Sequence, residues 1–368
     1  MDPRYAHITG WGMAVPDKVL TNSDLEKIVD TNDEWIVSRT GIRERHIAGA
    51  NETTATLAAD AALRALEVAN LHPGDLDMII ISTSSPEHIF PATASLVQDQ
   101  IGAVKAAAFD LLAACTGFVY AINLASQAIK SNGANNVLVI GSETLSRVVN
   151  WKDRNTCILF GDGAGAFVLQ ASEEPGGVMS AVLRSDGSGA NLLSIPAGGS
   201  RHPASMQTLY DGMHYIQMNG REVFRFATRV MAEASLQAIE AANLTMDDIT
   251  LVIPHQANLR IIEAAARGLN IPMDQVMVNL DRYGNTSTAS IPIATIEAIE
   301  QGRLKPGDKT VMVAFGGGLT WGAALIEWTG PLPSQRRVST RQVRRTARIR
   351  SIFARLRRRI EGFIWGRQ

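Results

Sequence analysis

The sequence predicts an α/β protein made of two related halves in which helices alternate with buried strands. Apolar runs of strand length alternate along the chain with longer segments of helical periodicity, and residues 63–80 are repeated at residues 236–253. With 368 residues, 46% of them hydrophobic, and a mean hydropathy of +0.02, the chain is long and apolar enough to bury one large core or two joined ones.

The repeat becomes visible at an offset of 173 positions, where seven identical pairs occur across residues 63–80 and chance gives roughly one. The pairs join Leu63, Ala65, Glu67, Ala69, Asn70, Leu71 and Asp75 to Leu236, Ala238, Glu240, Ala242, Asn243, Leu244 and Asp248. Each copy predicts a helix, a short polar turn and a buried strand. At the same offset, the strand at 137–140 aligns with 310–313, and the helix after Cys115 aligns with residues from Thr288 onward.

We therefore predict an N-terminal half at 1–171, a C-terminal half at 172–330 and a separate tail at 331–368. Parallel strands should form one sheet in each half, with helices packed on both sheets and a site at the junction between the halves. The tail holds twelve Arg, no Lys and one acid, Glu361, which is a charge of +11, so the other 330 residues carry −12. Pro331 and Pro333 mark the joint.

Composition excludes several classes of protein. No run of eighteen apolar residues occurs and the N-terminus lacks a signal-peptide pattern, so a membrane-spanning or secreted protein is not expected. With only Cys115 and Cys157, a disulfide framework is excluded, and no clustered Cys and His spacing predicts a metal site. A reducing cytoplasm fits best.

Cys115 lies where an apolar strand-like run at 106–114 gives way to a helix predicted at 116–130 and ended by residues 131–133. A thiol at a helix N-terminus is a candidate nucleophile, because unpaired backbone N–H groups and the helix dipole stabilise the thiolate. The alternative is a small buried core residue, and position alone leaves the two equally open.

Two further residues stand at strand-to-helix junctions. His255 follows the second copy's buried strand, and Asn285 lies in a loop rich in Gly, Asn, Ser and Thr at 283–288. Taken singly, the first is more often structural and the second a turn or cap residue. In a doubly wound duplicate such junctions collect on one side of the sheets, so the three side chains are expected to converge. The glycine runs at 161–165 and 316–318 lack P-loop spacing and predict close backbone approach or an oxyanion-binding N–H.

Four segments, in order and at family spacing, resemble β-ketoacyl-acyl-carrier-protein synthase III of the thiolase superfamily: AACTGF at 113–118, PHQANLR at 254–260, GNTS at 284–287 and FGGGLTWG at 315–322. The resemblance runs from about residue 5 to 328. It implies a duplicated, five-layered αβαβα fold and a cytoplasmic, homodimeric acyltransferase that initiates type II fatty acid synthesis. The substrates would be acyl-CoA and malonyl-acyl-carrier protein, with no cofactor and no nucleic acid partner.

The same resemblance implies roles for individual residues. Cys115 would attack the acyl-CoA thioester and carry the acyl group, and His255 with Asn285 would stabilise the enolate that forms when the malonyl group loses CO₂. The N–H groups of Cys115 and Gly317 would form a second oxyanion site. The CoA-binding positions are Trp35, Arg39, Arg154, Gly220 and Asn258; the carrier-protein segment is Gln256, Ala257, Asn258, Leu259 and Arg260; and the acyl-pocket gatekeeper is Phe90.

Departures from the family pattern are few, and the resemblance leaves rivals to weigh. Thr116 stands where Ala or Ser is common and Arg221 where some members have Asn. A thiolase is disfavoured because Ala314 replaces its second cysteine, and Cys157 lies in a predicted apolar strand at 156–160 as a core residue. A hydroxymethylglutaryl-CoA synthase remains open through Glu87, as do a condensing enzyme of secondary metabolism and a non-enzymatic membrane-attached scaffold. Chain-elongating ketosynthases have a second histidine where this chain has Asn285.

The tail carries an amphipathic helical stripe with arginines on its other face. The stripe consists of Ile349, Ile352, Phe353, Leu356, Ile360, Phe363 and Ile364, with Trp365 near its end. We expect residues 336–367 to lie on an anionic membrane surface. An acidic carrier protein, nucleic acid and a disordered appendage are the alternatives.

Overall fold

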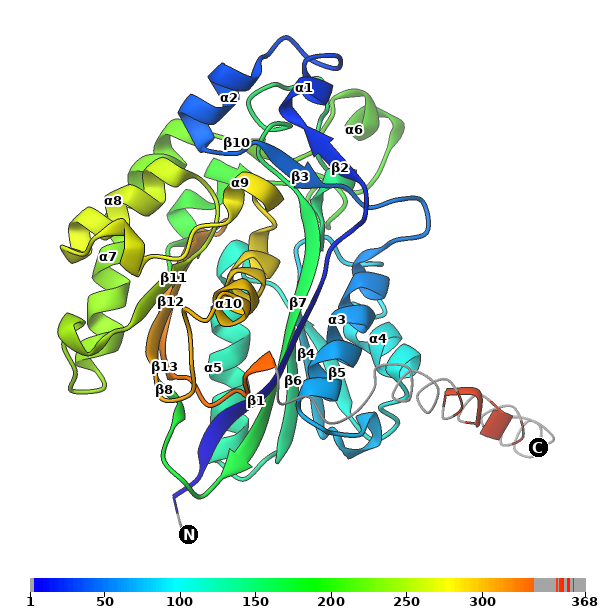
Figure 1. Cartoon of the computed structure of the whole chain (residues 1–368). Coiled ribbons are helices and arrows are strands. Elements are labelled where there is room, and N and C mark those ends of the chain that lie inside the picture. The colour runs from blue at the N-terminus through cyan, green and yellow to red at the C-terminus, as the bar shows by residue number, and fades with distance from the viewer. Residues whose placement is uncertain (1–2, 334–348, 350, 354–355, 358–359, 361–368) are drawn as a thin grey trace.

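A computed structural model describes residues 3–333, 349, 351–353, 356–357 and 360. Its elements form five layers in the order helices, sheet, helices, sheet, helices. In Figure 1 the layers run from α7 and α8 on the left to α3 and α4 on the right. The first sheet has the order β1-β7-β6-β4-β5, with β1 Tyr5–Ala14, β4 Met78–Ser82, β5 Ala107–Leu111, β6 Asn136–Thr144 and β7 Asp162–Ser172. The second has the order β11-β12-β13-β8, with β8 Gly177–Ser185, β11 Leu251–Pro254, β12 Lys309–Gly316 and β13 Thr320–Glu327.

Three pairs of helices supply the other layers. The outer pair on the first sheet is α3 (Thr54–Val68) and α4 (Thr93–Ile101), the central pair is α5 (Gly117–Lys130) and α10 (Ser290–Glu300), and the outer pair on the second sheet is α7 (Gly220–Glu240) and α8 (Leu259–Leu269). The largest core cluster joins α5 and α10 to strands of both sheets, and Phe118 and Ile291 are fully buried in it. The central helices therefore tie the two halves together.

Shorter elements connect these layers. The small sheets pair β2 (Val19–Thr21) with β3 (Glu44–His46) and β9 (Leu193–Ser194) with β10 (Gln217–Met218). The short α-helices are α1 (Asn22–Leu25), α2 (Asp33–Thr40), α6 (Met206–Tyr210) and α9 (Leu280–Tyr283). The 3₁₀ turns are η1 (Pro73–Asp75), η2 (Ala114–Thr116), η3 (Leu145–Arg147), η4 (Gly187–Leu192), η5 (Met246–Asp248), η6 (Met273–Gln275) and η7 (Ser287–Ala289).

The sequence repeat corresponds to repeated elements. In both copies a long helix, α3 or α7, is followed by an asparagine with positive φ, a 3₁₀ turn and a buried strand, β4 or β11. The asparagines, Asn70 (φ 52°) and Asn243 (φ 58°), adopt the left-handed conformation that this residue type tolerates better than most. The division of the chain at residue 171 stays a prediction.

The expected parallel strands form only part of each sheet. Strands β4, β5 and β6 pair in parallel, as do β11 and β12, but β6 with β7 and β12 with β13 are antiparallel. The glycine run after β12 is the reason in the second sheet, because the turn at 317–319 is too short for the helical crossover that a parallel partner needs.

Among the residues that the structure describes, no helix is long and apolar enough to cross a bilayer. The described tail residues are helical, and Ser351 is buried and donates a hydrogen bond to Asp99 at the end of α4 (3.4 Å). Ile349, Ile352, Phe353, Leu356 and Ile360 are 44–64% exposed. The predicted stripe residues Phe363 and Ile364, with Trp365, lie outside the described residues.

Candidate active site

Cys115 lies in η2, between the edge strand β5 and helix α5, as the sequence predicts. The Thr320 hydroxyl makes hydrogen bonds to the Ala113 carbonyl and the Thr116 hydroxyl, each at 3.0 Å, and these hold the turn against β13. Gly316 packs directly on Cys115, since a Cβ added there would lie 2.7 Å from the Cys115 backbone nitrogen. Gly316 of the glycine triplet is thus required for close approach to the cysteine.

The ionisation of Cys115 differs from the sequence-based expectation. Burial raises the pKa of its thiol to about 12, and the nearby Glu143 carboxylate adds to the increase. Desolvation of the thiolate thus opposes the activation expected from the helix terminus, and that activation stays a prediction. A hydrogen bond with Ser287 acts in the opposite direction.

His255 follows β11 and is held as a neutral ring. Its side chain is 1% exposed, its Nδ1 lies 2.7 Å from the Ser290 hydroxyl, and its ring meets Phe315 edge to face at 5.4 Å. Burial lowers the pKa of the imidazole to about 3. Since the Gln256 N–H already donates to the Ser290 oxygen (3.4 Å), that hydroxyl is free to donate to Nδ1, and we assign the ring proton to Nε2.

Asn285 is fixed by its backbone and by its side-chain oxygen. Its N–H donates to the Leu159 carbonyl (2.8 Å), and its side-chain oxygen accepts from the Ser287 N–H (2.8 Å). Its NH₂ group therefore remains available as a donor. The loop at 284–290 collects the predicted residues, because Ser287 meets Cys115 and Asn285 while Ser290 meets His255.

A cavity of about 480 Å³ opens over Cys115. Cys115, Ser287 and Gly317 line it together with the apolar side chains Leu112, Leu145, Phe160, Leu193, Ile195 and Ile216. Such walls suit an acyl chain that ends at the thiol.

A larger hollow of about 1040 Å³ brings together five of the residues predicted to bind CoA or carrier protein: Trp35, Arg39, Gly220, Asn258 and Arg260. The Arg39 and Arg154 guanidinium groups lie over the Trp35 ring at 4.6 and 4.8 Å. The two hollows are neighbours, because residues adjacent in sequence line them. Leu159 lines the larger hollow, and Phe160 lines the cavity over Cys115.

Four predicted residues lie elsewhere than expected. Gln256 is 1% exposed, and its side-chain NH₂ group donates hydrogen bonds to the Pro254 and Met277 carbonyls (2.8 and 3.0 Å). Its side chain therefore cannot contact a carrier protein. Phe90 is 85% exposed and does not line the cavity of its own chain. Cys157 is a core residue, but in a turn instead of a strand. Glu87 does not line the cavity and accepts from the Ala55 N–H (3.2 Å).

The sequence analysis missed Glu143 and Ser287. Glu143 is the penultimate residue of β6, has no exposed surface, and has a pKa raised by burial to about 7. The available signal was a carboxylate two residues beyond Gly141, at the carboxyl end of a buried strand, where functional side chains of α/β sheets collect.

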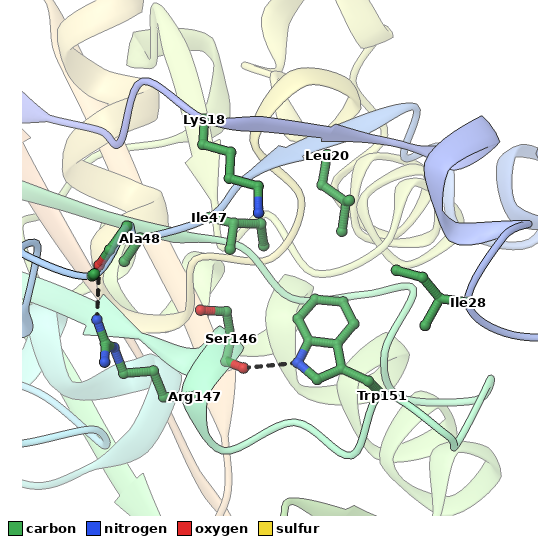
Figure 2. Close-up of a pocket in the computed structure, with 10 residues that line it drawn as sticks. Lys18, Leu20, Ile28, Ile47, Ala48, Ser146, Arg147 and Trp151 are labelled. Carbon is green, nitrogen blue, oxygen red and sulfur yellow. Dashed lines mark hydrogen bonds between the residues drawn. The ribbon is translucent and has the colours of Figure 1, made fainter.

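A separate hollow of about 380 Å³ is shown in Figure 2, with Lys18, Ile28, Arg147 and Trp151 around it. Much of its polar lining is already bonded: the Trp151 ring N–H donates to the Ser146 carbonyl (3.1 Å), and Arg147 donates to the carbonyls of Gly49 and Glu52. None of the predicted site residues lines it.

Comparison with known proteins agrees with this geometry. Residues 109–187 match the family model 3-Oxoacyl-[acyl-carrier-protein (ACP)] synthase III, and residues 239–328 match the model of its C-terminal part. The chain is 58% identical over 325 residues to beta-ketoacyl-[acyl-carrier-protein] synthase III of Roseiflexus sp. (strain RS-1), covering 88% of this chain and 99% of that protein. It is 58% identical over 322 residues to the same-named protein of Desulfitobacterium hafniense (strain DSM 10664 / DCB-2), covering 88% and 97%.

Among solved structures, that of 3-oxoacyl-[acyl-carrier-protein] synthase III from Aquifex aeolicus VF5 superimposes with a TM-score of 0.82 at 50% identity, covering 88% of this chain and all of the other. The resemblance inferred from the four motifs and the thiolase-like α/β fold are thereby confirmed.

Proposed function

Because the chain belongs to the 3-oxoacyl-[acyl-carrier-protein] synthase III family, we propose a two-stage reaction at Cys115. The enzyme is an acyltransferase that condenses an acyl-CoA primer with malonyl-acyl-carrier protein in fatty acid synthesis. The observation that carries the proposal is the placement of the Cys115 thiol in an apolar cavity that Ser287 also lines, because the loop of Ser287 fixes Asn285 and also holds the neutral His255 through Ser290.

In the first stage, the Cys115 sulfur attacks the thioester carbonyl of acyl-CoA, the acyl–sulfur bond to CoA breaks, and CoA leaves as the thiol. The negative charge on the carbonyl oxygen is held by the backbone N–H groups of Cys115 and Gly317. Gly317 lies in the wall of the same cavity, which supports this pairing.

In the second stage, the malonyl group loses CO₂ and negative charge develops on its thioester oxygen. The Nε2–H of His255 and the NH₂ of Asn285 donate hydrogen bonds to that oxygen, and no base is required because the departing carboxylate leaves its electron pair. The enolate carbon then attacks the acyl-cysteine, which forms 3-oxoacyl-carrier protein and releases Cys115. A neutral imidazole suits this role, because its single ring proton lies on Nε2 when Nδ1 accepts from Ser290.

The hollow beside Trp35 binds CoA in this proposal. The ligand's adenine enters between Trp35 and Arg154, which now lie in contact, while Arg39 meets the phosphates and Gly220 and Asn258 line the pantetheine path. Arg260 is exposed at the start of α8 and presents the charge that an acidic carrier protein requires, with Ala257 and Leu259 beside it.

We also propose a homodimer. Strand β5 is an edge of the first sheet, and Ile89, Phe90 and Leu112 beside it are 84%, 85% and 77% exposed. A second copy would cover these side chains, and because Leu112 also lines the cavity, the partner's Phe90 would lie near the acyl chain. Sedimentation of wild type against Phe90→Asp tests this: we expect the variant to dissociate, and an unchanged dimer would contradict it.

The reaction as proposed needs no cofactor, because acyl-CoA is a substrate and the protein's own groups supply each step. A cytoplasmic location fits the two free cysteines, Cys115 and Cys157, which remain reduced there.

For the tail, we propose adsorption to an anionic lipid surface. The exposed apolar residues Ile349, Ile352, Phe353, Leu356 and Ile360 follow one another at steps of three, one, three and four, and Ser351 faces the body of the protein instead. The twelve arginines of residues 331–368 supply the complementary charge. Full-length protein should co-sediment with anionic vesicles and not with neutral ones, whereas residues 1–330 should bind neither; equal partitioning of both proteins would end this proposal.

Transfer of labelled acyl groups tests the enzymatic proposal. Acetyl-CoA labelled in the acetyl group should acylate wild type at one site and should leave Cys115→Ala unlabelled. Turnover of malonyl-acyl-carrier protein with a panel of acyl-CoA primers then defines the primer. Labelling of Cys115→Ala to the same extent would point to another nucleophile, and absence of label from the wild type would point to a scaffold.

A further inference from the structure

Glu143 is a buried carboxylate without a basic partner. Both of its oxygens accept from the Ser84 N–H at 3.1 Å, one accepts from the Ser85 hydroxyl at 2.5 Å, and the Thr83 hydroxyl lies at 3.3 Å. Its exposed fraction is zero, and among the described residues no Lys, Arg or His side chain contacts it. A carboxylate buried in this way changes its protonation near neutral pH, since its pKa is about 7.

Ser287 connects this carboxylate to the nucleophile. Its side chain acts on the Cys115 thiol and on the Glu143 carboxylate, and it lowers the pKa of each. The serine is 2% exposed and lines the cavity with Cys115 and Ser84, and its N–H is tied to the Asn285 side chain at 2.8 Å. Its position between thiol and carboxylate is therefore fixed by the same loop that positions Asn285.

We propose that Ser287 and Glu143 form the path that takes the thiol proton from Cys115 when the cysteine is acylated. The proposal deepens, and rests on, the acylation step described above. As the bond between Sγ and the thioester carbon forms, the Sγ proton passes to the Ser287 oxygen while the Ser287 hydroxyl proton passes to Glu143. The bond from the acyl carbon to CoA then breaks, and the CoA thiolate takes a proton from water.

The proton on Glu143 returns at the end of the cycle. When the enolate carbon attacks the acyl-cysteine, the Cys115 thiolate is released and recovers its proton through Ser287. Each turnover thus consumes one proton from water, which matches the overall loss of one carboxylate as CO₂. During the intervening stage Glu143 is neutral, so it does not repel the malonyl carboxylate that approaches the same cavity.

The other titratable groups nearby are less suited to this task. His255 binds Ser290 through Nδ1, and its pKa of about 3 makes it a far weaker base than Glu143. Glu87, on the loop after β4, binds the Ala55 N–H. The Glu143 charge does act on Cys115, because it raises the pKa of the thiol.

Ser287→Gly breaks the path and preserves the fold, because Ser287 has a φ of 50°, which glycine adopts freely, and the loop bonds to Glu143 remain. Thr288→Ala is the matched control: it removes a hydroxyl from the same turn that binds Ser82 (2.8 Å) instead of Cys115. With labelled acetyl-CoA in single turnover, we expect Ser287→Gly to acylate about 10²-fold more slowly and Thr288→Ala to match wild type. Wild-type labelling itself tests the underlying function separately.

Glu143→Gln distinguishes proton transfer from a structural role. In wild type the acylation rate should rise with pH through about 7, as Glu143 becomes the carboxylate; in Glu143→Gln that inflection should vanish. The Ser287→Gly variant can be acylated slowly beforehand. The acylated variant should then react with malonyl-carrier protein at near the wild-type rate. The proposal would be overturned if the pH profile of Glu143→Gln kept its inflection, or if Ser287→Gly acylated at the wild-type rate. It would also be overturned if Ser287→Gly slowed acylation and the malonyl stage by the same factor.

Discussion

Replacement of His255 by alanine separates the two stages of the reaction. Burial lowers the pKa of His255 to about 3 and raises that of Cys115 to about 12, so a proton transfer from the thiol to the imidazole would be strongly uphill, and Nδ1 of the ring is already bonded to Ser290. His255 is therefore not the base for Cys115, and His255→Ala should acylate at a rate within about threefold of wild type.

The second stage should respond very differently. Loss of one of two donors to the developing enolate oxygen costs about 3 to 4 kcal/mol, so decarboxylation of malonyl-carrier protein by the acylated variant should fall by about 10² to 10³-fold. Ser290→Ala keeps the ring but removes the bond that places its proton on Nε2, and a smaller loss, about tenfold, is expected.

Rapid-quench labelling measures the first stage, and release of labelled CO₂ measures the second. Circular dichroism and thermal unfolding serve as the folding control, because His255→Ala also removes the edge-to-face contact with Phe315. If acylation fell by the same factor as decarboxylation while the fold stayed intact, His255 would be acting on the cysteine and the assigned roles would be refuted.

Three further predictions follow from the binding hollow and the core. Trp35→Ala should raise KM for acyl-CoA about tenfold or more with little change in KM for malonyl-carrier protein, measured by steady-state kinetics, because only the nucleotide loses its stacking partner. Arg260→Glu should raise KM for the carrier protein in a way that added salt weakens, whereas Lys305→Glu, on another surface, should not. Glu297→Ala should lower the free energy of unfolding by about 2 to 4 kcal/mol in urea, because it leaves Arg282 and the Tyr283 hydroxyl without their buried acceptor; a loss under 1 kcal/mol would contradict this.

Much of the fold was predictable from local patterns. The apolar spacing after Cys115 predicted a helix at 116–130, and α5 occupies Gly117–Lys130. The offset of 173 positions paired that helix with α10, which begins at Ser290, and β6 with β12. Such signals survive because helical periodicity and strand-length apolar runs depend on residues near one another in the chain.

The chemistry of the site was only partly predictable. The motifs identified Cys115, His255, Asn285 and the glycine triplet, and the structure places them on loops at one end of the two sheets, although their roles remain proposals. Gln256 belonged to the same motif, yet its amide is consumed inside the protein, and no sequence pattern separates its inward direction from the outward direction of Arg260.

By itself, then, the sequence determined the α/β class, the duplication and the family of the chain. The tertiary structure decided that Cys115 is a buried, protonated thiol, that His255 is neutral, and that Glu143 and Ser287 lie beside the nucleophile. The physical reason is desolvation. A pKa depends on which groups from distant parts of the chain exclude water and donate hydrogen bonds, and Glu143, Ser287 and Cys115 meet only when both halves are folded together.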